Sequence, residues 1–253
     1  MLRGFEGFRE WFQGCGDQYA IIGGTACYLL MSENGLDFRA TKDIDLVLIV
    51  EVLDKQFATR FWDYVVAAGY EHRNRSSGQM EFYRFSNPKS RDYPAMIELF
   101  SKKTDVVVLP DHAVLTPLPM DDDISSLSAI LLNDDYYDFL KTGRIRISGV
   151  TVLDTLYLIP FKAKAWIDLS DRKAAGEQVD SKNIRKHKND IFRLTELLTQ
   201  EQKVFQNLPV MIEKDMREFF RRIVTEEVDL VQLGILGRTK EDVFRQLRHV
   251  YGV

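Results

Sequence analysis

Residues 43–50, with the sequence DIDLVLIV, are a run of β-branched and apolar residues that begins with two aspartates. This composition predicts a mostly buried β-strand. Because alternate residues of a strand point to the same face, the carboxylates of Asp43 and Asp45 would project side by side. Two such anions repel unless a cation offsets them or the strand end is open to water. The pattern therefore predicts either a Mg²⁺ site, since Mg²⁺ prefers oxygen ligands, or a solvated acidic strand end.

A double glycine lies upstream of these acids, between an apolar run and a predicted helix. Residues 19–22 predict a short strand that stops at Gly23 and Gly24. Thr25 is then expected to cap a helix that continues to Met31. A turn with positive φ is a sufficient reason for the glycines. The alternative is a triphosphate site beside the acids, because the amides of a helix N-terminus attract phosphate.

The first 150 residues alternate predicted strands and helices, whereas the remainder shows only helical periodicity. Aromatic residues recur at helical spacing from Phe5 to Phe12, and the helix predicted over 57–68 stops at Gly69. Residues 81–85 and 95–100 have strand character. Later segments with a 3.6-residue period are 153–169, 184–198, 210–224 and 243–250. We therefore predict two domains, residues 1–150 with strands and helices, and residues 151–253 with helices alone.

Composition excludes several classes of protein. With 45% hydrophobic and 28% charged residues, the chain has the profile of a soluble globular protein. Its net charge of −4 argues against a protein that coats nucleic acid over its whole surface. Cys15 and Cys27 have neither CxxC spacing nor further partners, which favours a reducing compartment. No apolar stretch is long enough for a membrane span, so we expect a cytoplasmic protein without a membrane partner.

The stretches IIGGTACYLL (21–30) and RATKDIDL (39–46) together form a recognisable signature. They resemble the hydrophobic-Gly-Gly/Ser and Asp-x-Asp motifs of the DNA polymerase β-type nucleotidyltransferase superfamily, and within it the AbiEii-like abortive-infection branch. PFKAKAW (160–166) and KHKNDIFRL (186–194) are similar to later helices of that branch, so the resemblance covers residues 19–198. One departure is the gap of eighteen residues between Gly24 and Asp43, which is longer than the usual pattern.

The resemblance implies an α+β fold, in which a nucleotidyltransferase domain with a mixed β-sheet flanked by helices is followed by an all-α domain. It implies two Mg²⁺ ions held by Asp43, Asp45 and a third carboxylate from a later strand. Glu98 in MIELF (96–100) is the candidate, because it is the one acid inside an apolar strand. An edge-strand glutamate that faces water is the alternative reading.

The remaining site residues implied by the resemblance are expected to hold phosphates. Lys162 and Lys164 are about 200° apart on a helix, so only one can face the site, and the resemblance selects Lys162 for the triphosphate or the departing pyrophosphate. A snorkelling lysine on a core helix is the alternative. Asp190 would orient a lysine or bind a metal through water. The predicted nucleotide-binding residues are Gly23, Gly24, Thr25, Arg39, Thr41 and Lys162.

The implied activity is enzymatic: transfer of a nucleoside monophosphate from an NTP to an acceptor hydroxyl, with pyrophosphate as the leaving group. By resemblance the acceptor is RNA, including a tRNA 3′ end, or a protein. A toxin role in a toxin–antitoxin or phage-defence system, with a cognate antitoxin as partner, follows from the AbiEii-like branch alone. The alternative is a catalytically inactive module on the same fold that binds nucleotide or a protein partner, and the long gap after Gly24 favours it.

Overall fold

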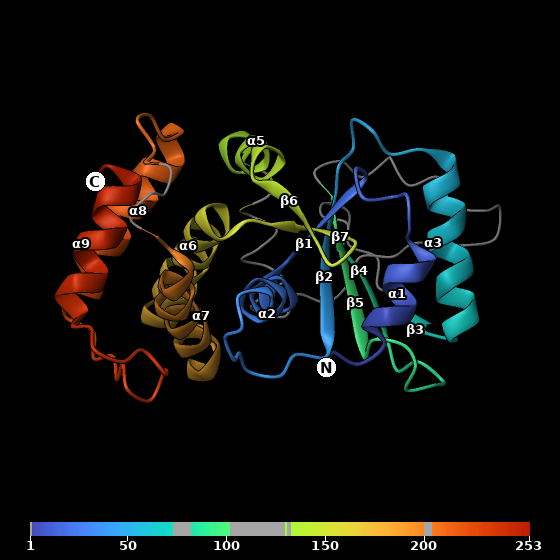
Figure 1. Ribbon diagram of the computed structural model, residues 1–253, viewed down its shortest axis with the longest axis horizontal. Helices are drawn as coiled ribbons and strands as arrows, with labels where there is room; N and C mark the ends of the chain where they lie inside the picture. Colours follow the sequence, from blue (N-terminus) through green and yellow to red (C-terminus); the bar gives the residue numbers. More distant parts are fainter. Residues whose placement is uncertain (1, 73–81, 102–129, 131–132, 200–203) are drawn as a thin grey trace. The chain divides into compact units, whose positions relative to one another are not determined.

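The computed structural model describes residues 2–72, 82–101, 130, 133–199 and 204–253. Its contacts divide the chain into two compact units, residues 1–120 with 144–154, and residues 121–143 with 155–253 (Figure 1). Residues 121–143 thus group with the later helices. The predicted domains, 1–150 and 151–253, stay a prediction.

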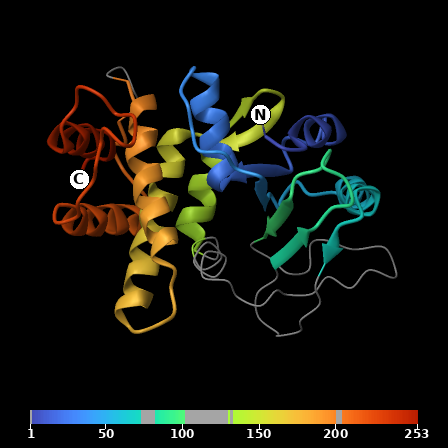
Figure 2. The same cartoon turned by 90° about the horizontal axis from the view of Figure 1, so that it is seen from below.

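The first unit is built on a seven-stranded sheet with the strand order β3-β4-β5-β2-β1-β7-β6 (Figure 2). Strand β1 is antiparallel to β2 and parallel to β7, and β2 is parallel to β5, so the sheet is mixed. The strands are β1 (Tyr19–Ile22), β2 (Asp43–Leu48), β3 (Glu71–His72), β4 (Phe82–Ser86), β5 (Met96–Phe100), β6 (Arg144–Ile147) and β7 (Val150–Leu153).

Within the described residues, three helices flank this sheet, α1 (Phe5–Trp11), α2 (Gly23–Glu33) and α3 (Lys55–Ala68). Helices α1 and α3 lie on one face and α2 on the other (Figure 1). An aromatic cluster fills the space between α1, α3 and β1, with ring centroids about 5 to 6 Å apart, as between Phe12 and Tyr64. Helix α3 begins at the side-chain cap of Asp54 and ends at Gly69, which has a φ of +61° as the stop signal predicts.

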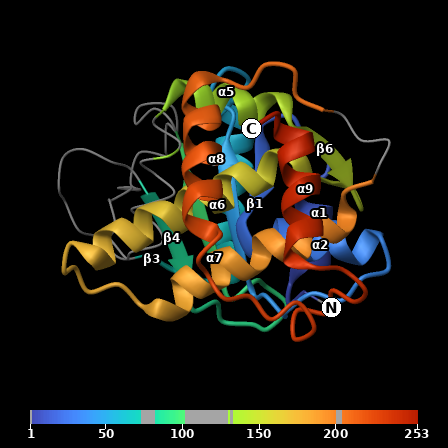
Figure 3. The ribbon, with the colours of Figure 1, turned by 90° about the vertical axis from the view of Figure 1, so that its left-hand side faces the viewer.

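The described part of the second unit consists of helices and connecting segments (Figure 3). They are α5 (Asp134–Thr142), α6 (Thr155–Ala174), α7 (Ser181–Leu194), the 3₁₀ turn η1 (Thr195–Leu197), α8 (Val210–Ile223) and α9 (Lys240–Tyr251). Helix α6 packs on α5, α7 and α8. The predicted α+β class, a mixed sheet flanked by helices and followed by a helical part, is confirmed. None of the described helices is long and apolar enough to cross a membrane.

Two local predictions were wrong. Thr25 does not cap α2, because the helix begins two residues earlier with Ile22 at the cap position and no side-chain cap bond. Residues 150–153 form strand β7, whereas helices alone were predicted for residues 151–253. Ser148 and Gly149 both have positive φ, 49° and 84°, as a two-residue hairpin turn requires, and they connect β6 to β7.

Candidate active site at the start of β2

Gly23 and Asp45 are in contact at the point where β1 becomes α2. Gly23 has a φ of +67°, and a methyl group added to it would lie 1.8 Å from Oδ2 of Asp45. A side chain at position 23 would therefore displace the carboxylate, and the left-handed φ favours glycine independently. The structure thus places the second aspartate of the Asp-x-Asp pair against the double-glycine bend.

Thr25 connects helix α2 to the first aspartate of the pair. Its side chain is fully buried, and its hydroxyl donates a hydrogen bond of 2.5 Å to the carbonyl oxygen of Asp43. The residue between the two aspartates, Ile44, is buried in the sheet. Because alternate strand residues share a face, the side chains of Asp43 and Asp45 both leave the sheet on the face opposite to Ile44.

Arg39 and Thr41 lie over the second glycine. A methyl group on Gly24 would lie 3.3 Å from Nη2 of Arg39 and 3.3 Å from Oγ1 of Thr41. The guanidinium of Arg39 also stands over the ring of Phe38, 5.3 Å from its centroid. The segment before β2 therefore returns to the N-terminus of α2, in spite of the eighteen residues that separate the glycines from the acids.

Glu98 occupies the centre of a row of charged residues across three strands. In register, Asp45 of β2 pairs with Glu98 of β5, and Glu98 pairs with Arg84 of β4. Arg84 donates to Oε1 of Glu98 from Nε at 2.7 Å and from Nη2 at 2.6 Å. Strand β5 lies between β2 and β4, so the alternative reading of Glu98 as an edge-strand residue was wrong.

The environment of Glu98 disfavours its charge. Burial and then the neighbouring Asp45 raise the pKa of Glu98 to about 8, although the Arg84 guanidinium acts in the opposite direction. The surroundings of Glu98 therefore favour its neutral, protonated form. A cation nearby would favour the charged form.

The acidic residues fit a divalent cation in kind, because Mg²⁺ takes oxygen ligands from one or two carboxylates and completes its shell with water and phosphate oxygens. Asp43 and Asp45 supply such a pair on one face of β2. However, the described residues hold no group of three or more His, Cys, Asp or Glu side chains placed to bind a metal ion. Metal binding by the pair is compatible with the structure, and the predicted three-carboxylate site with two ions stays a prediction.

Lys162 and Asp190, the predicted site residues of the second unit, form a buried ion pair with each other. Nζ of Lys162 lies 2.9 Å from Oδ2 of Asp190, and the side chains are only 4% and 2% exposed. The prediction that Asp190 orients a lysine agrees with this contact. Binding of a triphosphate by Lys162 stays a prediction.

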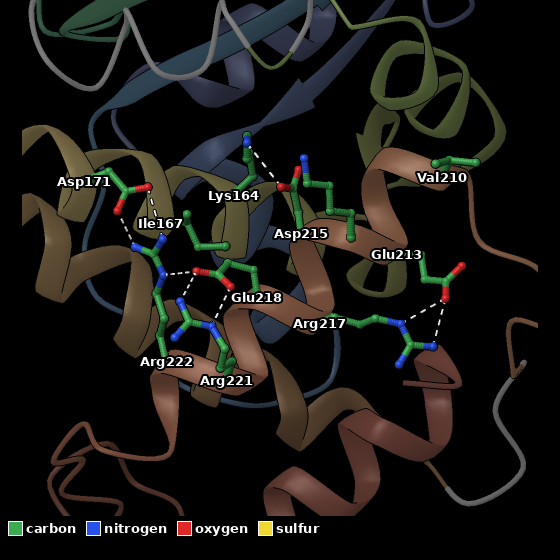
Figure 4. Close-up of a pocket in the computed structure, with 11 residues that line it drawn as sticks. Lys164, Ile167, Asp171, Val210, Glu213, Asp215, Arg217, Glu218, Arg221 and Arg222 are labelled. Atoms are coloured by element: carbon green, nitrogen blue, oxygen red, sulfur yellow. Dashed lines mark hydrogen bonds and ion pairs between the residues drawn. The ribbon is translucent and has the colours of Figure 1, made fainter.

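Lys164 has a different acid partner, on α8. Its ammonium lies 3.2 Å from Oδ1 of Asp215, and the hydroxyl of Tyr136 donates to Oδ2 of the same carboxylate at 3.0 Å. Burial and the Asp215 charge raise the pKa of Tyr136 well above its ordinary value. Lys164 and Asp215 line a pocket of about 700 Å³ between α6 and α8 (Figure 4). Most of its charged residues form ion pairs with one another, including Arg217 with Glu213.

Sequence reasoning missed Arg84 and Asp215. Both carried a signal of the kind that identified Glu98, since each is a lone charge in an apolar setting. Arg84 interrupts the strand FYRFS, and Asp215 stands on the helix face that also carries the buried residues Ile212, Met216 and Phe219. Their partners lie in other elements, so the pairing itself was not available from the sequence.

Comparisons with known proteins give a distant likeness. No family model and no curated protein matches the sequence. Among solved structures, the chain is similar to an antigenic nucleotidyltransferase-like protein from Paracoccidioides brasiliensis, with 17% identity over 90% of this chain and 88% of the other, and a TM-score of 0.41. It is also similar to a cytoplasmic RNA terminal U-transferase, with 11% identity over 89% and 67% of the two chains, and a TM-score of 0.31.

Proposed function

We propose that this chain is a Mg²⁺-dependent nucleotidyltransferase, which moves a nucleoside monophosphate from an NTP to an acceptor hydroxyl and releases pyrophosphate. The observation that carries the proposal is the contact between Asp45 and Gly23, because it joins a carboxylate pair suited to a divalent cation to a helix N-terminus suited to phosphate. Either feature alone has an ordinary structural explanation. Their contact is what a site for a metal-bound triphosphate requires.

In this proposal the phosphates are attracted by groups of the first unit. The amides in the first turn of α2 lack intrahelical acceptors, and no acidic side chain of that turn competes with a phosphate. Gly24 lets the side chains of Arg39 and Thr41 lie against the start of α2, where they would contact a phosphate. Asp43 and Asp45 would hold the cation. Mg²⁺ would supply charge neutralisation of the phosphates and activation of the acceptor hydroxyl.

The acceptor and the biological role are proposed from the sequence resemblance alone. RNA, including a tRNA 3′ end, or a protein hydroxyl is the proposed acceptor. A toxin role with a cognate antitoxin would follow from membership of the AbiEii-like branch. Lys162 and Asp190 are retained as proposed contributors to triphosphate binding, and their mutual ion pair gives Asp190 the part of holding Lys162.

The test is transfer of label from each α-labelled NTP, in the presence of Mg²⁺, to total RNA and to lysate protein. We expect labelled product with the natural chain and none with Asp43→Asn/Asp45→Asn, which keeps the side-chain shape and removes the charge. Asp63→Asn, an exposed acid on α3, is the matched control and should retain full transfer. Equal labelling by the natural chain and the double variant would refute the proposal.

A second candidate function is a non-catalytic module that binds nucleotide. The ion pair between Arg84 and Glu98 favours this alternative, because the guanidinium occupies an oxygen of the third predicted carboxylate. Calorimetry separates the two functions. Mg²⁺-dependent NTP binding without product in the transfer assay would support the module, whereas binding with product would exclude it.

A further inference from the structure

The charged row across β4, β5 and β2 carries an inference that rests on the proposed function and deepens it. Arg84 and Glu98 make a two-point contact at 2.6 and 2.7 Å, and their side chains are 23% and 12% exposed. Both donors meet the same oxygen, Oε1 of Glu98, so the contact fixes the position of that oxygen. Glu98 is therefore held from the β4 side, by a residue that is itself in a strand.

The other neighbour of Glu98 is Asp45. The two are directly paired in the parallel register of β2 and β5. Asp45 in turn lies against Gly23. Arg84 is thus connected to Gly23 through two intervening side chains, those of Glu98 and Asp45.

We propose that Arg84 is a positioning residue, which holds Glu98 away from the cation, so that Asp43 and Asp45 bind the divalent cation and Glu98 does not. This assignment replaces the third-ligand role that the sequence predicted for Glu98. It agrees with the finding that the described residues contain no ready group of three metal-binding side chains. Arg84 also offsets one of the negative charges that would otherwise meet at this end of the sheet.

The two roles of Glu98 give opposite results in a double variant. Arg84→Gln/Glu98→Gln removes the guanidinium and the carboxyl group together, and both glutamines retain hydrogen-bonding groups. If Glu98 is held outside the coordination shell, the double variant keeps the cation affinity. If Glu98 is a ligand, it loses an anionic oxygen from the coordination shell, and no glutamine at position 84 replaces it.

The probe is Mn²⁺, which prefers the same oxygen ligands as Mg²⁺ and whose free signal in electron paramagnetic resonance reports its binding directly. We expect the double variant to bind Mn²⁺ within about threefold of the natural chain. Arg84→Gln alone should bind several-fold more tightly, because it removes a positive charge and releases Glu98 toward the cation. Asp45→Asn should weaken Mn²⁺ binding by about 100-fold or more, because it removes a direct ligand, and even the loss of a group that only orients a ligand costs about 10- to 100-fold.

A loss of tenfold or more in the double variant would overturn the inference, and so would unchanged or weaker binding by Arg84→Gln. Far-UV circular dichroism of each variant confirms that the fold is retained. The controls separate this inference from the proposed function. If the natural chain and Asp43→Asn/Asp45→Asn bind Mn²⁺ equally, or neither binds it, then the inference and the proposed function both fail. If Asp43→Asn/Asp45→Asn abolishes the binding and Arg84→Gln/Glu98→Gln also loses it, only the inference about Arg84 and Glu98 fails.

Discussion

The buried ion pair between Lys162 and Asp190 allows a quantitative test of the second unit. Replacing Lys162 by Met keeps the apolar stem and the helix propensity but leaves the Asp190 carboxylate, 2% exposed, without its cation. Removing one member of a buried pair costs about 3–5 kcal/mol, because the remaining charge keeps its desolvation penalty. Against a total stability of about 5–15 kcal/mol for a domain, this loss is large.

Urea unfolding followed by circular dichroism, with tryptophan fluorescence, to which the buried Trp166 contributes, as a second probe, measures the loss. Two variants make the result specific. Arg217→Met breaks an exposed pair, with side chains 57% and 44% exposed, and should cost less than about 0.5 kcal/mol. Lys162→Met/Asp190→Leu removes both charges and should recover most of the lost stability, since an apolar pair of similar size often replaces a buried ion pair without penalty.

A cost below about 1 kcal/mol for Lys162→Met, or a double variant less stable than the single one, would refute this reasoning. The double variant also separates the two roles assigned to Lys162. If it folds stably and still transfers label at the natural rate, Lys162 serves only the structure. If it folds stably and transfer is lost, the predicted contact with the triphosphate is supported.

Two further substitutions test the close approaches at glycines. Gly23→Ala should lower the free energy of unfolding by about 1–3 kcal/mol more than Gly35→Ala, because both glycines have φ near +70° but only the methyl at Gly23 would meet the Asp45 carboxylate. Equal losses in urea titrations would contradict that placement of Asp45. Gly143→Ala should cost about 1–3 kcal/mol, because its methyl would lie 2.1 Å from Cγ of Tyr157. An unchanged thermal midpoint for Gly143→Ala would show that the C-terminal end of α5 does not contact Tyr157 of α6 as described.

Local signals predicted most elements of the first unit. The strand at Tyr19–Ile22 has the bounds that its apolar run indicates, and α3 ends at Gly69 because a left-handed residue satisfies the last turn. The role of Thr25 was mistaken for a reason outside the local sequence. Its hydroxyl is bonded to the backbone of β2, a tertiary partner eighteen residues away, so a residue with a strong local capping preference serves a different contact.

The site was predictable where one element determined it. Side-by-side projection of Asp43 and Asp45 follows from strand geometry alone. The row from Arg84 to Asp45 depends on strand order, which places β5 between β2 and β4, and no local pattern encodes that order. The two lysines of α6 show the same limit. Helical geometry predicted that they point differently, and the structure supplies their separate partners, Asp190 and Asp215, from two other helices.

In the proposed site, the acidic and the positively charged groups around β2 would bind the triphosphate in different ways. Asp43 and Asp45 repel a triphosphate, so they contribute to its binding only through a cation between them and the phosphates. In the proposed site, Arg39 and the N-terminus of α2 would attract the phosphates directly, and Arg39 lies against Gly24. Gly23 stands between these groups, where its missing side chain lets the Asp45 carboxylate come against the helix start. The two glycines therefore accommodate different neighbours: Gly23 admits the Asp45 carboxylate, and Gly24 admits the side chains of Arg39 and Thr41.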